Sequence, residues 1–377
     1  SFQVQTAAIV QAASLSSCSG ENFSLIPSNT LNGNSIPVAT TYSWNAPIVT
    51  GNMTGGTSGT NQNNIFGTLV NTTTSLQTAT YTIIPKTGNC EGNPFQLTVS
   101  VNPIGNVSQP QNFIFCSGNN SNVTSFSTIN TTGSTTYAWT NSNTAIGLPA
   151  SGTGSIPQFL TTNSTSAPIS AQITVTPTLI NGVSSCVGTP KTFTIFINPA
   201  AQINQPNNLI LCAGAASGAI SFSTINTGGT TSYNWANSNS NIGLPSSGSG
   251  PISSFIAQNN TNAPITANIT VTPNFTANNV TCPGGSKTFT IIVNPRGQVN
   301  PVQNIVVCNG GTMNSIPFST NNTSENTTYS WTTNQTSIGI SSNGTGNFPE
   351  FNAINNGLSP IVATITVTPT YANNNIS

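Results

Sequence analysis

The chain has 377 residues, of which only 2% are charged: four basic and four acidic side chains, with no histidine and no aspartate. Ordinary domains are about 25% charged, so this surface lacks the basic stripe that nucleic-acid binding requires and the attraction to anionic lipid that membrane-surface binding requires. No apolar run is long enough to span a bilayer. We therefore expect no nucleic-acid partner and no direct membrane contact.

The rarest residues recur at a fixed spacing, so the chain is an internal repeat. The four tryptophans lie 95, 96 and 96 residues apart, and each closes a Tyr-x-Trp triplet. Asn-Pro pairs end the units near Pro103, Pro199 and Pro295. This register predicts four domains, with boundaries 1–103 (divergent), 104–199, 200–295 and 296–377, the last one truncated before its final strand. The triplets are Tyr42–Trp44, Tyr137–Trp139, Tyr233–Trp235 and Tyr329–Trp331.

Each repeat is predicted to consist of short strands, because apolar and polar residues alternate with period two and Thr, Ile, Val, Phe and Tyr favour strands. No stretch has a 3.6-residue apolar stripe, so we expect essentially no helix. A Gly- and Ser-rich turn at 246–250 separates two of the strands. In the third repeat the apolar stretches are Leu209–Cys212, Ile220–Thr224, Tyr233–Trp235, Ile252–Ala257, Ile265–Thr272 and Phe289–Asn294.

Six or seven strands in about 96 residues, with a Trp on the third, predict an all-β fold of tandem immunoglobulin-like β-sandwich domains arranged as a linear rod. The eight aromatic residues of the Tyr-x-Trp triplets are expected in the cores. The alternative, a sugar-stacking role for the Trp, is less favoured, because no tryptophan is left over to form a binding platform.

The pattern Cys-x-Gly, Tyr-x-Trp, Ala-Pro-Ile…Ile-Thr-Val-Thr-Pro, Cys-x-Gly…Phe-Thr-Ile-x-Val-Asn-Pro resembles the PKD-like repeats of Bacteroidota cell-surface proteins. Its best copies are CAGAASGAISFSTI, TTSYNWANSN, APITANITVTP and CPGGSKTFTIIVNP. It is most similar to the large secreted adhesins of gliding motility, the SprB type. The resemblance covers the whole chain, with the first repeat departing most. It implies part of a secreted adhesin or filament at the cell surface.

The chain lacks the groups that catalysis and metal binding need. Without His, Ser and Thr have no base to activate them. The four acids (Glu21, Glu91, Glu325 and Glu350) occupy non-equivalent repeat positions, so neither a paired-carboxylate site nor a calcium site is predicted. The cysteines form no Cys-x-x-Cys pair, which argues against zinc. We expect no enzyme, cofactor or metal.

Two further modifications are also not expected. An isopeptide crosslink at the equivalent Lys191 and Lys287 would need a recurring acid nearby, and none recurs. Asn-x-Ser/Thr sequons such as Asn163-Ser164-Thr165 and Asn259-Asn260-Thr261 are expected by chance in so Asn- and Thr-rich a chain.

Two cysteines per repeat at fixed spacing predict disulfides. The favoured scheme bonds within repeats, because each repeat could then fold alone, and it leaves Cys308 to a cysteine expected at position 378. Bonding across boundaries and a staggered scheme remain open. Against the favoured scheme, the end of the first strand and the last hairpin lie at opposite poles of an immunoglobulin fold. Within repeats the pairs are Cys18–Cys90, Cys116–Cys186 and Cys212–Cys282; across boundaries Cys90–Cys116, Cys186–Cys212 and Cys282–Cys308; staggered Cys18–Cys186 and Cys116–Cys282.

The function predicted from these features is that of a structural stalk, which spaces an adhesive tip from the cell surface in attachment or gliding motility. Its expected location is extracellular, and its expected partners are adjacent repeats of the same chain. Two alternatives stay open. One is a polysaccharide-binding module, in which repetition supplies avidity. The other is lateral assembly of like chains through edge strands that carry almost no guarding charge.

Overall fold

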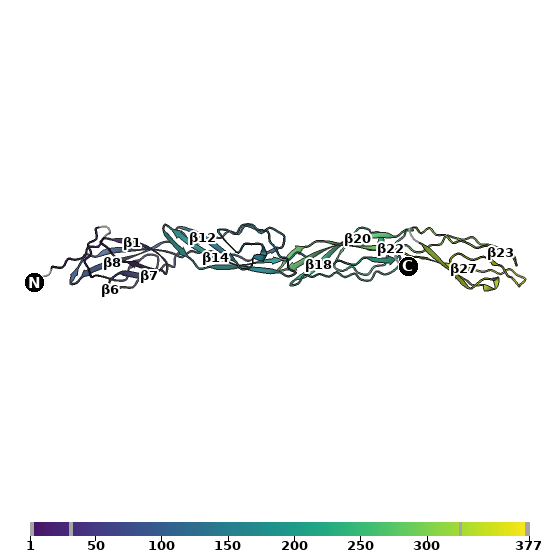
Figure 1. The fold of residues 1–377 in the computed structure, drawn as a ribbon, viewed down its shortest axis with the longest axis horizontal. Helices are drawn as coiled ribbons and strands as arrows, with labels where there is room; N and C mark the ends of the chain where they lie inside the picture. Colours follow the sequence, from purple (N-terminus) through teal and green to yellow (C-terminus); the bar gives the residue numbers. More distant parts are fainter. Residues whose placement is uncertain (1–3, 30–32, 324–325, 374–377) are drawn as a thin grey trace. The chain divides into compact units, whose positions relative to one another are not determined.

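The computed structural model describes residues 4–29, 33–323 and 326–373, and it divides into two compact units, Ser1–Asn198 and Pro199–Ser377. Each unit is described by itself (Figure 1). Across the described residues the chain forms strands and loops, and the helical elements are three short 3-10 turns: η1 (Thr144–Ile146), η2 (Ser240–Ile242) and η3 (Thr336–Ile338). None of the helices in this part of the chain has the length and apolar character needed to cross a membrane.

The first repeat forms a two-layer sandwich. Its larger sheet has the order β1-β10-β8-β3-β6, with β4 and β9 also paired to β8. The first strand runs parallel to the last, while the other pairs are antiparallel. The second layer is β2-β7-β5. The strands are β1 (Ala13–Cys18), β2 (Asn22–Leu25), β3 (Thr40–Trp44), β4 (Ile48–Val49), β5 (Thr54–Gly55), β6 (Gly59–Gln62), β7 (Ile65–Val70), β8 (Gln77–Thr87), β9 (Cys90–Glu91) and β10 (Phe95–Asn102).

The second repeat, in the same unit, repeats this order as β11-β16-β14-β12-β13, with β15 paired to β14. Its first strand is again parallel to its last. The second layer is reduced to two isolated bridges, Asn120 to Leu160 and Thr124 to Ile156. The strands are β11 (Phe113–Cys116), β12 (Ser134–Asn141), β13 (Ser151–Thr153), β14 (Ile169–Asn181), β15 (Ser184–Val187) and β16 (Lys191–Asn198).

The second unit contains the third repeat, with the order β17-β22-β20-β18-β19, and the fourth, with β25-β24-β27 and the pair β23-β26. In the third repeat β21 also pairs with β20. The strands are β17 (Leu209–Cys212), β18 (Thr230–Asn237), β19 (Ser247–Ser249), β20 (Ile265–Ala277), β21 (Val280–Pro283), β22 (Lys287–Asn294), β23 (Thr312–Met313), β24 (Thr327–Thr333), β25 (Asn343–Thr345), β26 (Phe351–Asn352) and β27 (Ile365–Tyr371).

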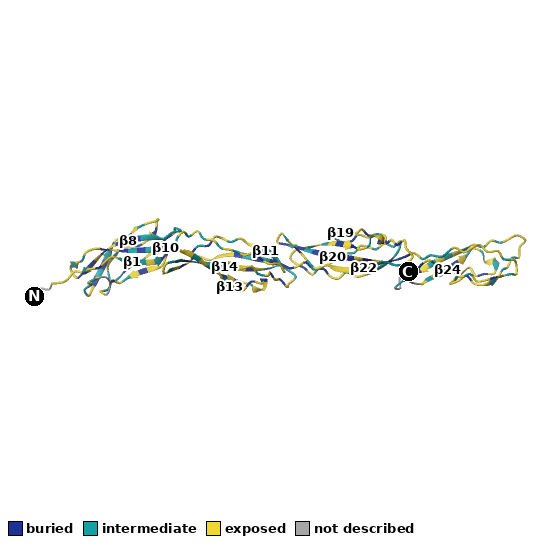
Figure 2. Cartoon of the chain, turned by 90° about the horizontal axis from the view of Figure 1, so that it is seen from above, coloured by how far each residue is buried: buried dark blue, intermediate teal, exposed yellow. Residues whose placement is uncertain are grey.

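The cores follow from the alternation seen in the sequence. Along β20, from Thr266 to Ala277, buried residues alternate with exposed or half-buried ones, as expected for a strand with one face in the core. Figure 2 shows this alternation of buried and exposed positions along the labelled strands. Each repeat has its own buried cluster built around its tryptophan. The all-β sandwich fold predicted from the sequence is therefore confirmed.

The predicted core role of the tryptophans is confirmed, and a glycine on the neighbouring strand explains how they fit. All four are 8% exposed or less. Gly152 on β13 lies opposite Trp139, and a Cβ at Gly152 would stand 2.2 Å from Trp139 Cζ2. Gly248 has the same relation to Trp235. The Gly-rich turn expected at 246–250 therefore includes a short strand, β19, which covers the indole ring.

The core prediction for the tyrosines is only partly right. Tyr42 is buried at 2% exposure, whereas Tyr137, Tyr233 and Tyr329 are half-buried. In the later repeats the tyrosine ring packs against a phenylalanine, such as Phe222 beside Tyr233 at 5.5 Å between centroids. One side of that ring stays in contact with solvent.

The second layer also differs from expectation. The stretches 220–224 and 252–257 of the third repeat are not regular strands; they meet through the bridges of Ile220 with Ile252 and Ala216 with Ile256. In the second stretch Ile252 and Ala257 are buried, whereas Ile256 is 56% exposed. In 220–224 partly buried and exposed residues alternate as the sequence showed, without a continuous backbone ladder.

Candidate functional site: the junction between successive repeats

The end of the first strand in repeat 1 lies at the pole of that sandwich next to repeat 2. Strand β1 pairs in parallel with β10, so Cys18 stands opposite Asn102, the last residue of β10. From repeat 2, the hairpin of β14 and β15 reaches the same place, because β1 and β15 are in contact. The junction is therefore formed by one strand end, one hairpin and the linker that follows Asn102.

Asn102 connects the two sandwiches through its side chain. It is 1% exposed, and its Nδ2 donates to Ser16 Oγ at 3.2 Å while its Oδ1 accepts from Asn181 Nδ2 at 2.7 Å. The Ser16 hydroxyl in turn hydrogen bonds with that of Ser184 at 2.8 Å. A buried amide needs such partners, because an unpaired one costs about 1–3 kcal/mol. The Asn of the Asn-Pro boundary is thus a structural part of the junction.

A disulfide between Cys18 and Cys186 crosses this junction, with 5.5 Å between the Cα atoms, a separation that disulfide geometry allows. Both cysteines are buried, at 5% and 1% exposure, and they form a small apolar cluster of their own with the fully buried Leu179. The bond links residues 168 apart in sequence. It therefore joins repeat 1 covalently to repeat 2.

The favoured within-repeat pairing is wrong, and strand direction explains why. Cys18 bonds to Cys186 rather than to Cys90. Cys90 lies at the opposite pole, where its Sγ contacts the carbonyl oxygen of Gln5 at 3.5 Å. From Phe95 to Asn102, strand β10 alone separates the poles by about 23 Å, at roughly 3.3 Å per residue. A disulfide requires Cα atoms within about 7 Å.

The remaining cysteines also depart from the within-repeat scheme. Cys116 and Cys282 are both disulfide-bonded, while Cys90, Cys212 and Cys308 carry free thiols. Hence neither Cys116–Cys186 nor Cys212–Cys282 forms, and the boundary pairs that involve Cys90, Cys212 or Cys308 are excluded as well. A partner for Cys308 outside these 377 residues stays a prediction.

Two glycines allow the linker to lie directly on the hairpin. The backbone N–H of Gly105 donates to the carbonyl of Cys186 at 3.1 Å. A Cβ at Gly188 would stand 1.7 Å from the carbonyl oxygen of Gly105, and a Cβ at Gly105 would stand 2.7 Å from that of Pro177. Side chains there would push the linker away. The glycine of the second Cys-x-Gly motif therefore serves the junction.

A second contact holds the other side of the junction. The backbone N–H of Thr131, in repeat 2, donates to the carbonyl of Thr74, in repeat 1, at 2.9 Å. Next to it, Leu76 N–H donates to Thr132 Oγ1 at 3.1 Å. Contacts on two sides oppose bending in more directions than a single linker would.

The second unit repeats these contacts at the equivalent residues. Asn373 Nδ2 donates to Asn294 Oδ1 at 3.1 Å, and Thr323 N–H donates to the carbonyl of Asn262 at 2.8 Å. Cys212, the counterpart of Cys18, carries a free thiol here. Two of the polar contacts of the first junction therefore recur in the second unit.

The sequons have a structural role. Asn163 and Asn259 are buried, at 8% and 6% exposure. Each Nδ2 donates to two backbone carbonyls: for Asn163 these are Ala167 and Ile197, at 2.9 and 2.8 Å. Each Oδ1 accepts from the N–H of the Thr two residues on, at 2.9 Å. The Asn-x-Thr pattern thus recurs because it builds a turn, and the Nδ2 atoms are enclosed.

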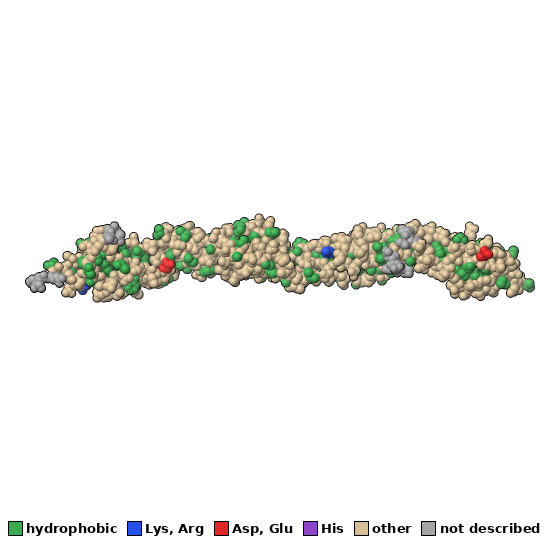
Figure 3. Space-filling model, in the orientation of Figure 1, with side chains coloured by type: hydrophobic (Ala, Val, Ile, Leu, Met, Phe, Trp, Pro, Cys, Tyr) green, Lys and Arg blue, Asp and Glu red, His purple; other side chains and the backbone are tan. Residues whose placement is uncertain are grey.

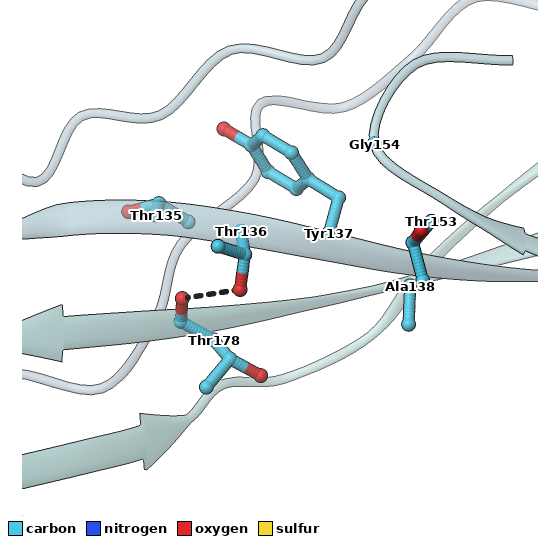
Figure 4. A pocket seen from close by; sticks show the side chains of 7 residues that line it. All are labelled: Thr135, Thr136, Tyr137, Ala138, Thr153, Gly154 and Thr178. Carbon is cyan, nitrogen blue, oxygen red and sulfur yellow. Dashed lines mark hydrogen bonds between the residues drawn. The ribbon is translucent and has the colours of Figure 1, made fainter.

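A shallow hollow recurs on the surface at equivalent positions of repeats 2 and 4. In repeat 2 it has a volume of about 440 Å³ and no charged lining residue. Figure 4 shows Tyr137 on one side of its strand and Thr136 on the other, where Thr136 Oγ1 donates to the carbonyl of Thr178 at 3.3 Å. The hollow of repeat 4 is lined by Thr327, Thr328, Tyr329, Ser330, Thr345, Gly346, Asn347 and Thr370.

Charged and titratable groups are sparse on the surface. Figure 3 shows one face, on which very few atoms belong to charged side chains. Among the described residues no three of His, Cys, Asp and Glu gather as a metal site would require, and Glu325 lies outside those residues. Burial raises the pKa of Tyr81 to about 12; its hydroxyl is enclosed without a hydrogen-bond partner.

Comparison with known proteins gave one family match and several similar solved structures. Residues 16–105 match the PKD-like domain family, and no curated protein matches the sequence. Among solved structures, the chain is similar to the human desmocollin-1 ectodomain (11% identity, 97% of this chain and 78% of that chain, TM-score 0.25) and to protocadherin gammaB7 EC3-6 (11%, 97% and 98%, 0.32). Mouse cadherin-23 EC22-24 is a further match (9%, 76% and 96%, 0.28).

At such TM-scores the chains do not superpose as wholes, so the fold is established by the strand pairing. The first strand of the PKD-like match ends in Cys18, and the match continues through β10 to Gly105. It therefore covers the sandwich of repeat 1 and the start of the linker. The chain consists of tandem β-sandwich domains, and residues 16–105 match the model of the PKD-like domain family.

Proposed function

We propose that the chain is a spacer segment of an extracellular adhesin, built from four domains with boundaries at 103, 199 and 295. In this role the domains keep an adhesive region at a distance from the cell surface and transmit tension between them. The disulfides support an oxidising, extracellular location. The sequence resemblance to SprB-type adhesins supports attachment or gliding motility as the process.

The observation that carries this proposal is the junction of the first unit. It combines a buried disulfide, the Asn102–Asn181 hydrogen bond and the Thr131–Thr74 contact. A flexible string of domains has no need of such contacts, because inter-domain contacts of this kind restrict relative motion. The recurrence of two of them in the second unit supports a function that depends on defined junctions.

Small-angle scattering of the whole chain tests the spacer. Four domains of about 35–40 Å each, from strands of roughly 3.3 Å per residue plus loops, predict a length of about 150 Å and a radius of gyration of about 43 Å. A compact chain of this size would give about 21 Å. A value near the compact figure, or a profile of freely jointed domains, would contradict the spacer function.

Polysaccharide binding is the second candidate, because the same hollow recurs in repeats 2 and 4 with Tyr137 or Tyr329 on its wall. A tyrosine face and threonine hydroxyls suit a sugar ring, and repetition would add avidity. Glycan-array binding that is saturable and is lost in the double variant Tyr137→Ala, Tyr329→Ala would place this function ahead of the spacer.

Like chains are the remaining candidate partners. The edge strands carry almost no charge to prevent pairing with a neighbour. Sedimentation of the full chain over a wide concentration range tests this, and a single monomeric species throughout would exclude it.

A further inference from the structure

The position of the Cys18–Cys186 bond along the chain has a mechanical consequence. Cys18 ends the first strand of repeat 1, and Cys186 lies in β15, the last element before the final strand of repeat 2. The two residues are thus close to the two ends of the first unit. Between them run strands β2 to β14, which contain most of the cores of both sandwiches.

We propose that this disulfide is a tension bypass, which carries force across two successive domains without passing it through strands β2 to β14. Tension applied at the start of the chain travels through β1 to Cys18, crosses the bond to Cys186, and continues through β16. The two cysteines are 168 positions apart in the sequence. The 167 residues between them therefore lie outside this covalent path. The inference rests on the spacer function proposed above and specifies how such a spacer resists extension.

The staggered pairing suits this role better than the pairing that sequence reasoning favoured. A bond from Cys18 to Cys90 would enclose part of one domain and leave the junction itself in the path. The observed bond encloses the junction, so Asn102, its hydrogen bond from Asn181 and the linker at Gly105 lie outside the covalent path that carries tension.

The surroundings of the bond fit a permanent link. Cys18 and Cys186 are buried at 5% and 1% exposure and pack with Leu179. Exchange with an external thiol requires access to a sulfur atom, which this burial opposes while the unit is folded. Strand β1 also stays paired to β10 over six residues, so the segment leading to Cys18 is itself anchored in the sheet.

Single-molecule pulling on the full chain tests the bypass, with one handle at the N-terminus and one at the exposed Ala200. The covalent path between these points contains about 33 residues when the bond is present (residues 1–18 and 186–200) and about 200 when it is absent. At roughly 3.4 Å per residue, the fully extended lengths are about 110 Å and about 680 Å. We expect the shorter length for the natural chain and about a sixfold increase for Cys18→Ser and for Cys186→Ser.

The matched control is Cys90→Ser, which removes a free thiol and should leave the short length unchanged. Extension of the natural, oxidised chain to about 680 Å between these handles would overturn the bypass. So would a short length that persists in both Cys18→Ser and Cys186→Ser. The scattering experiment on the whole chain is independent of these lengths, so the spacer function and the bypass succeed or fail separately.

Discussion

Replacing Asn102 by alanine tests whether the polar contacts define the junction. The substitution removes the hydrogen bonds to Ser16 and from Asn181 and leaves no replacement group at a site that is 1% exposed. Each hydrogen bond contributes about 0.5–1.5 kcal/mol net, so the junction should lose about 1–3 kcal/mol. The disulfide remains, and the loss is expected as local opening rather than as global unfolding.

Hydrogen exchange at two backbone amides measures this opening. Ser19 N–H donates to the carbonyl of Asn102 at 2.8 Å and Gly105 N–H to that of Cys186 at 3.1 Å. A loss of 1–3 kcal/mol should speed exchange at both by about 5- to 150-fold, since each 1.4 kcal/mol is roughly tenfold. The exposed Asn119 provides the control substitution Asn119→Ala. Equal exchange in the two variants would refute the role given to Asn102.

A second variant, Asn102→Asp, separates hydrogen bonding from charge. The carboxylate has nearly the same shape and accepts hydrogen bonds, but at this buried site its ionised form is disfavoured. Its pKa in the folded state should lie above that in the unfolded state, so the variant's stability falls as pH rises through the two values. Exchange at Gly105 should therefore be slower at pH 4 than at pH 7 after correction for intrinsic rates. The reverse order would contradict burial of this side chain.

Two further predictions concern the sandwiches themselves. Gly248→Ala puts a Cβ 2.2 Å from Trp235 Cζ2, so overpacking should lower the stability by about 1–3 kcal/mol, measured as faster hydrogen exchange in β18. The control Gly285→Ala adds a Cβ with nothing within 4 Å and should change the stability little. Equal losses of stability in the two variants would contradict the packing of the indole ring against Gly248. Because the chain has no His or Asp, its thermal stability should change little between pH 5 and 8. Burial raises the pKa of Tyr81 from 10.0 to about 12. The folding stability that the neutral, buried hydroxyl contributes is therefore complete below pH 10 and is lost as the pH rises towards 12. An unchanged melting temperature up to about pH 12 would contradict this expectation.

The sequence predicted the main sheet of each repeat well, because its strands bury one face and so alternate with period two, as β20 and β22 do. The second layer was harder to predict. From Ile220 to Thr224 the side chains alternate in the same way, although the backbone pairs only at isolated bridges. Side-chain burial leaves an alternating pattern in the sequence, whereas the number of backbone hydrogen bonds between paired strands leaves no such pattern.

The junction could be located from the sequence but its chemistry could not. Asn102-Pro103 lies at this junction, yet the contact of Asn102 with Asn181 spans 79 residues and has no local signature. The disulfide pairing failed for a related reason. Cysteine spacing is compatible with several connectivities, and the choice depends on β1 running parallel to β10, which places Cys18 beside the next repeat. The expectation that each repeat contains its own disulfide was therefore the wrong basis for choosing a connectivity.

Non-reducing peptide mapping tests whether a covalent link crosses the junction between repeats 1 and 2. Free thiols are alkylated in the denatured, unreduced chain, which is then digested. The structure predicts a linked peptide pair containing Cys18 and Cys186, with Cys90, Cys212 and Cys308 alkylated. A linked pair containing Cys18 and Cys90 would contradict this link and restore bonding within repeats.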